Sequence, residues 1–279
     1  AWARNWRGRS MEEAAAKVGK EPRHIKEWES GESVPTVRQA RILAEFYERP
    51  FLEFVLPRKP EVPEPSSIPD FRMQQGEEPP PKTRDVQLVQ QWAETQRTNA
   101  LDLFSEIGEH PPRIPNGLFF TPQTNVEHAA DQARSALKFS IQDQISMHAR
   151  QADALPTILR SKFEQFGILT LRRSDLKEYG VRGICLALFP LPVIVFRSEA
   201  PSAQAFTLAH ELAHILIRQS GIIGPRSTRY RTDPIERWAD QFAAAFLIPA
   251  PVVHSLLPPQ EAPSLQISDE QLSALATVF

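Results

Sequence analysis

The sequence predicts an α+β fold with an N-terminal all-α domain, a proline-rich linker, a helical segment, and a domain in which helices surround a small β-sheet. Three observations support this organisation. Residues 1–57 contain short amphipathic segments with helix-capping residues, and eight prolines fall between Pro57 and Pro81. Further along, three short apolar runs precede two helical patterns. The predicted limits are 1–57, 58–84, 85–152 and 153–250, followed by a tail over 251–279.

The first domain is predicted to contain three helices. Ser10 and Glu13 have the spacing of a capping box at the start of a helix that Gly19 ends. A second helix is expected over 21–30 and a third over about 36–47, because apolar residues recur there at helical spacing. Three helices with short turns between them are enough to enclose a small apolar core.

The linker and the segment after it differ sharply in composition. Proline fixes its own backbone and cannot donate a ladder hydrogen bond, so the linker is predicted to be a stiff, extended connector. Residues 84–109 then show apolar positions at helical spacing, and the apolar face of this long helix needs a partner. That partner is either the last domain or a second copy of the chain. Further helices are expected over 125–139 and 142–150.

The last domain is predicted to begin with a helix over 156–166. Three short apolar runs follow, over 168–171, 183–188 and 193–196, and they indicate the strands of a small sheet. The single cysteine, Cys185, lies in the second run, which predicts a buried core residue and excludes a disulfide within one chain.

The most informative segment is His210-Glu211-Leu-Ala-His214. Its apolar flanks predict a helix, so the two histidines lie on one face and can reach one metal ion. Glu211 is rotated by about 100°, out of the ligand set but close enough to act on a water molecule. With 7 histidines in 279 residues, this pattern arises by chance in about one such chain in a hundred. It predicts a catalytic zinc site, and the alternative is a buried structural pair of histidines.

A catalytic zinc site needs a third protein ligand. A helix predicted over 235–248 carries Glu236 and Asp240 one turn apart. One carboxylate can bind the metal while the other accepts the free N–H of a ligating histidine and fixes its tautomer. We assign Glu236 to the metal and Asp240 to the histidine, with Asp233 as the rival ligand. The alternative is an exposed acidic pair on a helix surface.

Two stretches together resemble the ImmA/IrrE family of zinc metallopeptidases: Phe206-Thr-Leu-Ala-His-Glu-Leu-Ala-His214 and Glu236-x-x-Ala-Asp-x-Phe-Ala-x-x-Phe-Leu-Ile-Pro249. The resemblance covers about residues 155–250. The family commonly has Asn where this chain has Asp240, and Leu-Leu-Met-Pro where it has Phe246 to Pro249; neither departure damages the expected chemistry.

This resemblance implies a gluzincin-like site with Zn²⁺ as its cofactor. In such a site the metal ligands would be His210, His214 and Glu236, and Glu211 would be the general base. Family members typically cleave a helix-turn-helix repressor protein. The resemblance therefore implies a regulatory protease, with a repressor or other regulatory protein as its substrate.

A second resemblance lies in Ile25-Lys-Glu-Trp-Glu-Ser-Gly-Glu-Ser-Val-Pro35, which is similar to the XRE (lambda-repressor-like) helix-turn-helix. It implies operator DNA as a partner, and a homodimer where the operator is palindromic. The residues expected to face the major groove are Arg23, His24, Lys26 and Glu27. Residues 1–57 hold ten Lys and Arg against nine Glu, a net charge of +1. Because this is a weak basic footprint, a helical module that only docks proteins stays open.

Expectations for substrate binding are less specific. In zincin-like folds an edge strand near the metal helix can bind an extended chain, and 183–188 or 193–196 are the candidate edges. The loop over 221–234 contains Arg229 and Tyr230, which could steady an oxyanion. An ordinary solvated basic loop explains these two residues equally well.

The composition is that of a soluble globular chain, with 41 % hydrophobic and 24 % charged residues. No apolar stretch approaches a membrane span and no signal peptide is visible, so we expect the cytoplasm and no membrane partner. The chain starts without Met and ends inside a helical pattern, so we expect the native protein to continue. The sequence thus predicts a DNA-binding regulator with a zinc endopeptidase that cleaves a repressor-type protein or itself. The alternative is a regulator whose zinc site is a sensor or structural.

Overall fold

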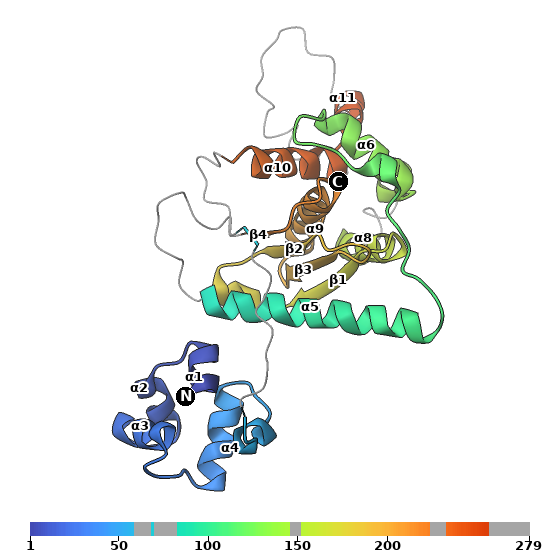
Figure 1. Cartoon of the computed structure of the whole chain (residues 1–279). Helices are drawn as coiled ribbons and strands as arrows, with labels where there is room; N and C mark the ends of the chain where they lie inside the picture. Colours follow the sequence, from blue (N-terminus) through green and yellow to red (C-terminus); the bar gives the residue numbers. More distant parts are fainter. Residues whose placement is uncertain (59–67, 70–82, 146–151, 224–232, 257–279) are drawn as a thin grey trace. The chain divides into compact units, whose positions relative to one another are not determined.

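The computed structural model describes residues 1–58, 68–69, 83–145, 152–223 and 233–256 (Figure 1). The chain forms two compact units, Ala1–Pro65 and Ser66–Phe279. The predicted connector and tail fall largely outside the described residues, so the finer domain limits stay a prediction.

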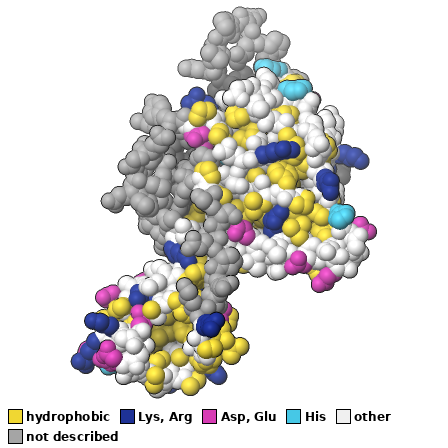
Figure 2. Space-filling view, in the orientation of Figure 1, with side chains coloured by type: hydrophobic (Ala, Val, Ile, Leu, Met, Phe, Trp, Pro, Cys, Tyr) yellow, Lys and Arg dark blue, Asp and Glu magenta, His cyan; other side chains and the backbone are white. Residues whose placement is uncertain are grey.

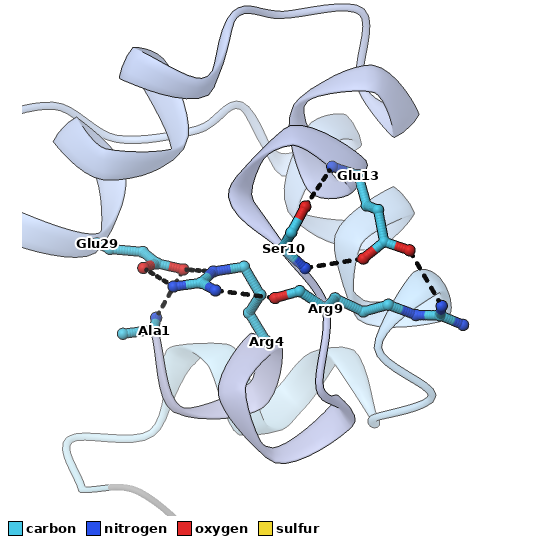
Figure 3. A network of polar contacts seen from close by, with 6 residues as sticks. All are labelled: Ala1, Arg4, Arg9, Ser10, Glu13 and Glu29. Atoms are coloured by element: carbon cyan, nitrogen blue, oxygen red, sulfur yellow. Dashed lines mark hydrogen bonds and ion pairs between the residues drawn. The ribbon is translucent and has the colours of Figure 1, made fainter. Parts of the chain in front are cut away.

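The N-terminal unit is entirely helical, as predicted. Ser10 and Glu13 form the predicted capping box: the Ser10 hydroxyl accepts from the Glu13 N–H at 3.1 Å, and the Glu13 carboxylate accepts from the Ser10 N–H at 2.8 Å (Figure 3). Thr36 and Gln39 form a second capping box. The first helix was not predicted, because no side chain caps it. The elements are α1 (Trp2–Arg7), α2 (Met11–Lys17), α3 (Pro22–Ser30), α4 (Val37–Phe46) and a 3₁₀ turn, η1 (Phe51–Val55).

Partly buried ion pairs tie α1 to the rest of this unit. Arg4 donates to both carboxylate oxygens of Glu29 on α3, at 2.8 and 2.9 Å, and to the Arg9 carbonyl at 2.8 Å (Figure 3). Arg7, only 5 % exposed, pairs with Glu48 at 2.8 Å. A bidentate arginine–carboxylate pair fixes both distance and orientation, so α1 is held against α3. An apolar core lies beside these pairs, formed mainly by Ala3, Ala14, Ala15, Ile25, Leu43 and Tyr47.

An apolar pocket opens on the N-terminal unit. Its volume is about 440 Å³, and its lining includes Trp28 of α3 and Phe54 of η1. Val34, Val37 and Val55 also line it and are strongly exposed. Figure 2 shows the hydrophobic surface that gathers on this unit.

Among the described residues, the C-terminal unit holds a four-stranded mixed sheet in the order β1-β3-β2-β4. Strand β2 is antiparallel to both β3 and β4, and β1 is parallel to β3. The expectation that 183–188 or 193–196 forms the edge is therefore wrong, because both strands are central. The short strand β4 was missed because three residues are too few to show a period of two. The strands are β1 (Leu169–Arg173), β2 (Gly183–Leu186), β3 (Val193–Arg197) and β4 (Gly221–Ile223).

Each face of the sheet is covered by helices (Figure 1). Along β2 and β3, alternate residues point to opposite faces. Ile184, Leu186, Val193 and Val195 pack in one core with Val86, Val89 and Ala93 of α5 (Thr83–Glu106). The long predicted helix therefore finds its partner in the sheet of its own chain. Cys185, Ile194 and Phe196 join the other core, which contains α8 (Leu155–Gln165) and α9 (Pro201–Leu216). Cys185 is buried, as predicted.

A third layer lies beyond α9, where α10 (Pro234–Leu247) packs between α9 and α6 (Val126–Ala136). Two described residues of the connector contact this unit: Ile68 packs against the core that includes Ile222 of β4, and the Ile222 N–H donates to the Pro69 carbonyl at 3.0 Å. Of the predicted helix over 142–150, residues up to 145 are helical and the rest lie outside the described residues. The described start of the predicted tail over 251–279 lies in a helix, α11 (Ala250–Leu256).

The remaining described elements are short 3₁₀ turns: η2 (Asn116–Leu118), η3 (Ala152–Ala154) and η4 (Asp175–Tyr179). Of the helices in the described part of the chain, even the 24-residue α5 lacks the apolar length that a bilayer crossing requires.

Candidate metal centre and DNA-reading helix

Helix α9 brings the two histidines of the motif together. It runs without Gly from Pro201, which suits the first helical position, to Leu216. His210 and His214 lie one turn apart, and their Nε2 atoms are 3.2 Å from each other. Both side chains are buried, at 3 % and 0 % exposed. Two imidazoles that share a buried position with their nitrogens converging suit a common ligand.

Helix α10 supplies the third side chain. Asp233 caps this helix by accepting from the Ile235 N–H at 2.8 Å and the Glu236 N–H at 3.4 Å. Glu236 lies in the first turn of this helix and points to α9. Its oxygens are 3.1 Å from His214 Nε2 and 3.5 Å from His210 Nε2. Asp233, the rival ligand, acts as the helix cap and is outside this group.

The spacing of these three groups fits a zinc ion. Ligand atoms about 2.0–2.1 Å from a tetrahedral zinc lie about 3.3 Å from each other. The two Nε2 atoms are 3.2 Å apart, and each lies 3.1 or 3.5 Å from one of the two oxygens of Glu236, which is close to that edge length. Nitrogen and carboxylate oxygen are also donors that zinc accepts. Among the described residues, His210, His214 and Glu236 are the group of His, Cys, Asp and Glu side chains close enough to share one metal.

Asp240 lies one turn after Glu236 and contacts the other nitrogen of His210. Its Oδ1 is 2.9 Å from His210 Nδ1. A carboxylate at that distance accepts the Nδ1 proton, which leaves the lone pair of Nε2 directed at the centre of the group. The acidic pair predicted on this helix therefore divides between two different contacts, and Glu236 is not exposed.

His210 and Glu236, both buried, shift each other's pKa values. Burial lowers the pKa of His210, but hydrogen bonds to Asp240 and Glu236 outweigh it and raise the pKa to about 9. Burial raises the pKa of Glu236, but hydrogen bonds with His210 and His214 outweigh it and hold the pKa far below its usual value. Without a metal, protons hold the carboxylate and imidazoles together. A dication would take the place of those protons.

Glu211 lies beside the group and does not join it. The side chain is fully buried against strand β2. Burial, and then the charge of Glu211, raise the pKa of the Cys185 thiol well above its usual value. Cys185 is therefore a protonated core residue that packs beneath α9.

Two residues that sequence analysis did not single out hold the end of α10. Arg134 donates to the Phe246 carbonyl at 2.6 Å and to the Gln144 side chain at 2.9 Å. Gln144 in turn donates to the Leu247 carbonyl at 2.9 Å. The sequence did carry a signal for Arg134, because it lies on the face of α6 that is otherwise formed by alanines and is buried. A buried charge needs a partner. Arg229 and Tyr230, predicted to contact substrate, lie outside the described residues.

The four residues predicted to contact DNA all lie on α3. Arg23 and Lys26 are exposed, whereas His24 and Glu27 are half-buried. Arg23 pairs with Glu21 at 3.0 Å on the surface. Arg4 and Arg7 are two of the ten basic residues of this domain, but both form ion pairs within it, with Glu29 and Glu48. The free basic charge near α3 is therefore smaller than the sequence suggested.

Two regions of the chain, one toward each end, match the models of known protein families. Residues 163–275 match the peptidase M78 family model, described as the IrrE N-terminal-like domain, and residues 1–54 match a helix-turn-helix family model. A search of curated proteins gave no match. The first match contains α9 and α10, which carry the metal-binding group, and the second contains α1 to α4. The chain therefore joins an N-terminal XRE-type helix-turn-helix domain to an IrrE N-terminal-like domain of a peptidase family.

Proposed function

We propose that this protein is a transcriptional regulator whose C-terminal domain is a zinc-dependent endopeptidase acting on a regulatory protein. The observation that carries the proposal is the buried group of His210, His214 and Glu236, spaced as zinc ligands, with the Glu211 carboxylate on the same helix. Both activities would operate in the cytoplasm, where DNA and its regulators meet.

Each residue of the site would have its own role in peptide hydrolysis. When bound, Zn²⁺ supplies Lewis acidity, which polarises the scissile carbonyl and lowers the pKa of water. His210, His214 and Glu236 would hold it, and Asp240 would keep the Nδ1 proton on His210. Glu211 would accept the proton of the attacking water on its carboxylate and deliver it to the leaving amine.

A structural or sensing role for the metal is the competing function. Structural zinc sites are closed by four protein ligands, whereas catalytic sites use three and leave one position open. Three protein side chains form the group within the described parts of the chain, which favours catalysis. The buried carboxylate of Glu211 is a further cost that a purely structural site has no need to bear.

The test of catalysis is the variant Glu211→Gln, which keeps the size of the side chain and removes its basicity. We expect a full metal content and an unchanged fold, with hydrolysis reduced by at least about a hundredfold. Mass spectrometry of the full chain with zinc, alone and mixed with a candidate repressor, identifies the cut. Cleavage by Glu211→Gln at the wild-type rate would sink the general-base role.

We propose a separate repressor-type protein as the substrate, and the connector of this chain as the second choice. The connector contains many prolines, which resist the extended strand pairing that peptidase clefts use. Mixing an intact Glu211→Gln chain with wild-type enzyme separates the two cases. Cutting of the inactive chain would establish the connector as a substrate and overturn the preference for a separate protein.

DNA binding is proposed to use the exposed side chains of α3. Arg23→Ala with Lys26→Ala should abolish sequence-specific binding in a gel-shift assay and leave metal content unchanged. Arg41→Ala with Arg58→Ala is the matched control, because it removes the same charge from exposed positions outside α3. Undiminished specific binding by the α3 variant would leave this domain as a protein-docking module.

A further inference from the structure

Strand β2 passes directly beneath the Glu211 side chain. Positions 183 and 185 face α9, because Ile184 and Leu186 pack on the opposite face of the sheet. Helix α9 packs on this strand. At position 185 a small thiol fills the space under the helix. At position 183 there is no side chain.

The space above Gly183 is occupied by the carboxylate. A methyl group on Gly183 Cα would lie 1.8 Å from Oε1 of Glu211, 2.7 Å from Cδ and 3.1 Å from Cγ. Non-bonded carbon atoms normally stay about 3.5–4.0 Å apart. The carboxylate therefore rests on the bare backbone of the strand, and even alanine would drive it away.

Backbone conformation does not explain this glycine. Six other glycines of the described chain have a positive φ, which L residues rarely adopt, and Gly183 is not among them. It lies in regular antiparallel pairing with Phe196 of β3 and Ile223 of β4. Other residues could adopt its backbone, so it is the close approach of Glu211 that restricts the position. Glycine inside a strand is the sequence signal for such an approach.

We propose that Gly183 is a positioning residue for the general base: by lacking a side chain, it leaves the place in which the Glu211 carboxylate lies. This inference rests on the proposed function, and it assigns a role to a residue that touches neither metal nor substrate. Glu211 is fully buried, so a displaced carboxylate has no solvent to move into. It must shift relative to the metal ligands or push α9 away from the sheet.

The variant Gly183→Ala tests the role in catalysis. We expect kcat to fall by roughly tenfold to a hundredfold, part of what a general base contributes, with KM and zinc content close to wild type. Gly117→Ala is the matched control, because nothing lies within 4 Å of a methyl group there and its φ is not positive. A Gly183→Ala enzyme with wild-type kcat would overturn the inference.

A stability cycle tests the contact without any turnover. Gly183→Ala should lower the Tm of the holoprotein by roughly 2–12 °C through overpacking. In a Glu211→Ala background the obstructing carboxylate is gone, so the same change should lower Tm by at most about a quarter as much. If Gly183→Ala alone does not fold but the double variant with Glu211→Ala does, the same conclusion follows more strongly. Equal losses in both backgrounds would overturn the inference, and this outcome is independent of whether the protein is a peptidase.

Discussion

Asp240 gives the sharpest test of how the metal ligands are oriented. Its Oδ1 lies 2.9 Å from His210 Nδ1. Removing such a partner of a ligating histidine typically weakens metal binding by about 10- to 100-fold, or about 1.4–2.7 kcal/mol. Asp240→Ala should therefore release zinc faster by this factor. Asp240→Asn keeps an oxygen that accepts the same N–H, and it should stay within about threefold of wild type.

The rate of zinc release is the appropriate measurement. The pKa of His210 is raised to about 9, so protons compete with zinc for its Nε2 atom. Asp240 favours the binding of the proton as well as the binding of zinc, and an equilibrium measurement would mix the two effects. Release into an excess of chelator starts from the loaded site, where no proton competes at Nε2. Asp102→Ala is the control, because Asp102 is exposed on α5. A release rate for Asp240→Ala equal to wild type, or Asn behaving as poorly as Ala, would refute the orienting role.

Two further predictions concern stability. Burial, then the charge of Glu29, raise the pKa of Tyr47 to about 12 from 10.0. The N-terminal unit should therefore lose about 2 kcal/mol of unfolding free energy as pH rises from 10 to 12. Tyr47→Phe should remove that loss in denaturant titrations; an unchanged pH profile would contradict it. Arg134→Met leaves the Phe246 carbonyl at the end of α10 and the side-chain oxygen of Gln144 without their donor, so Tm should fall with a loss of about 2–4 kcal/mol. Exposed Arg113→Met should lose almost nothing, and equal Tm values for the two would refute the capping role.

The sequence was most informative where chemistry depends on spacing along one helix. The i, i+4 relation of His210 and His214 needs only the helical period, and it predicted the pair before any tertiary structure was known. The capping box of Ser10 and Glu13 was predictable for the same reason, since it is a contact within four residues. Glu236 required the further assumption that two helices pack face to face.

Features that depend on tertiary contacts were not predictable. Gly183 has no motif, because its constraint comes from a carboxylate 28 positions further along the chain. The edge strand was assigned wrongly because β4 is too short to show its pattern, yet it pairs with β2 and makes that strand central. Arg4 and Arg7 were counted as charges for DNA, but their partners Glu29 and Glu48 are distant in sequence. Side-chain pairing of this kind follows only from the packed fold.

The zinc content of the purified protein tests the central claim most directly. We expect one tightly bound zinc per chain, because three buried donors lie close enough to share one ion. Changing His214 to Ala should remove it, whereas changing the exposed His128 to Ala should leave it in place. Elemental analysis of the three proteins decides the matter. A His214→Ala protein that keeps a full equivalent of zinc would contradict the account.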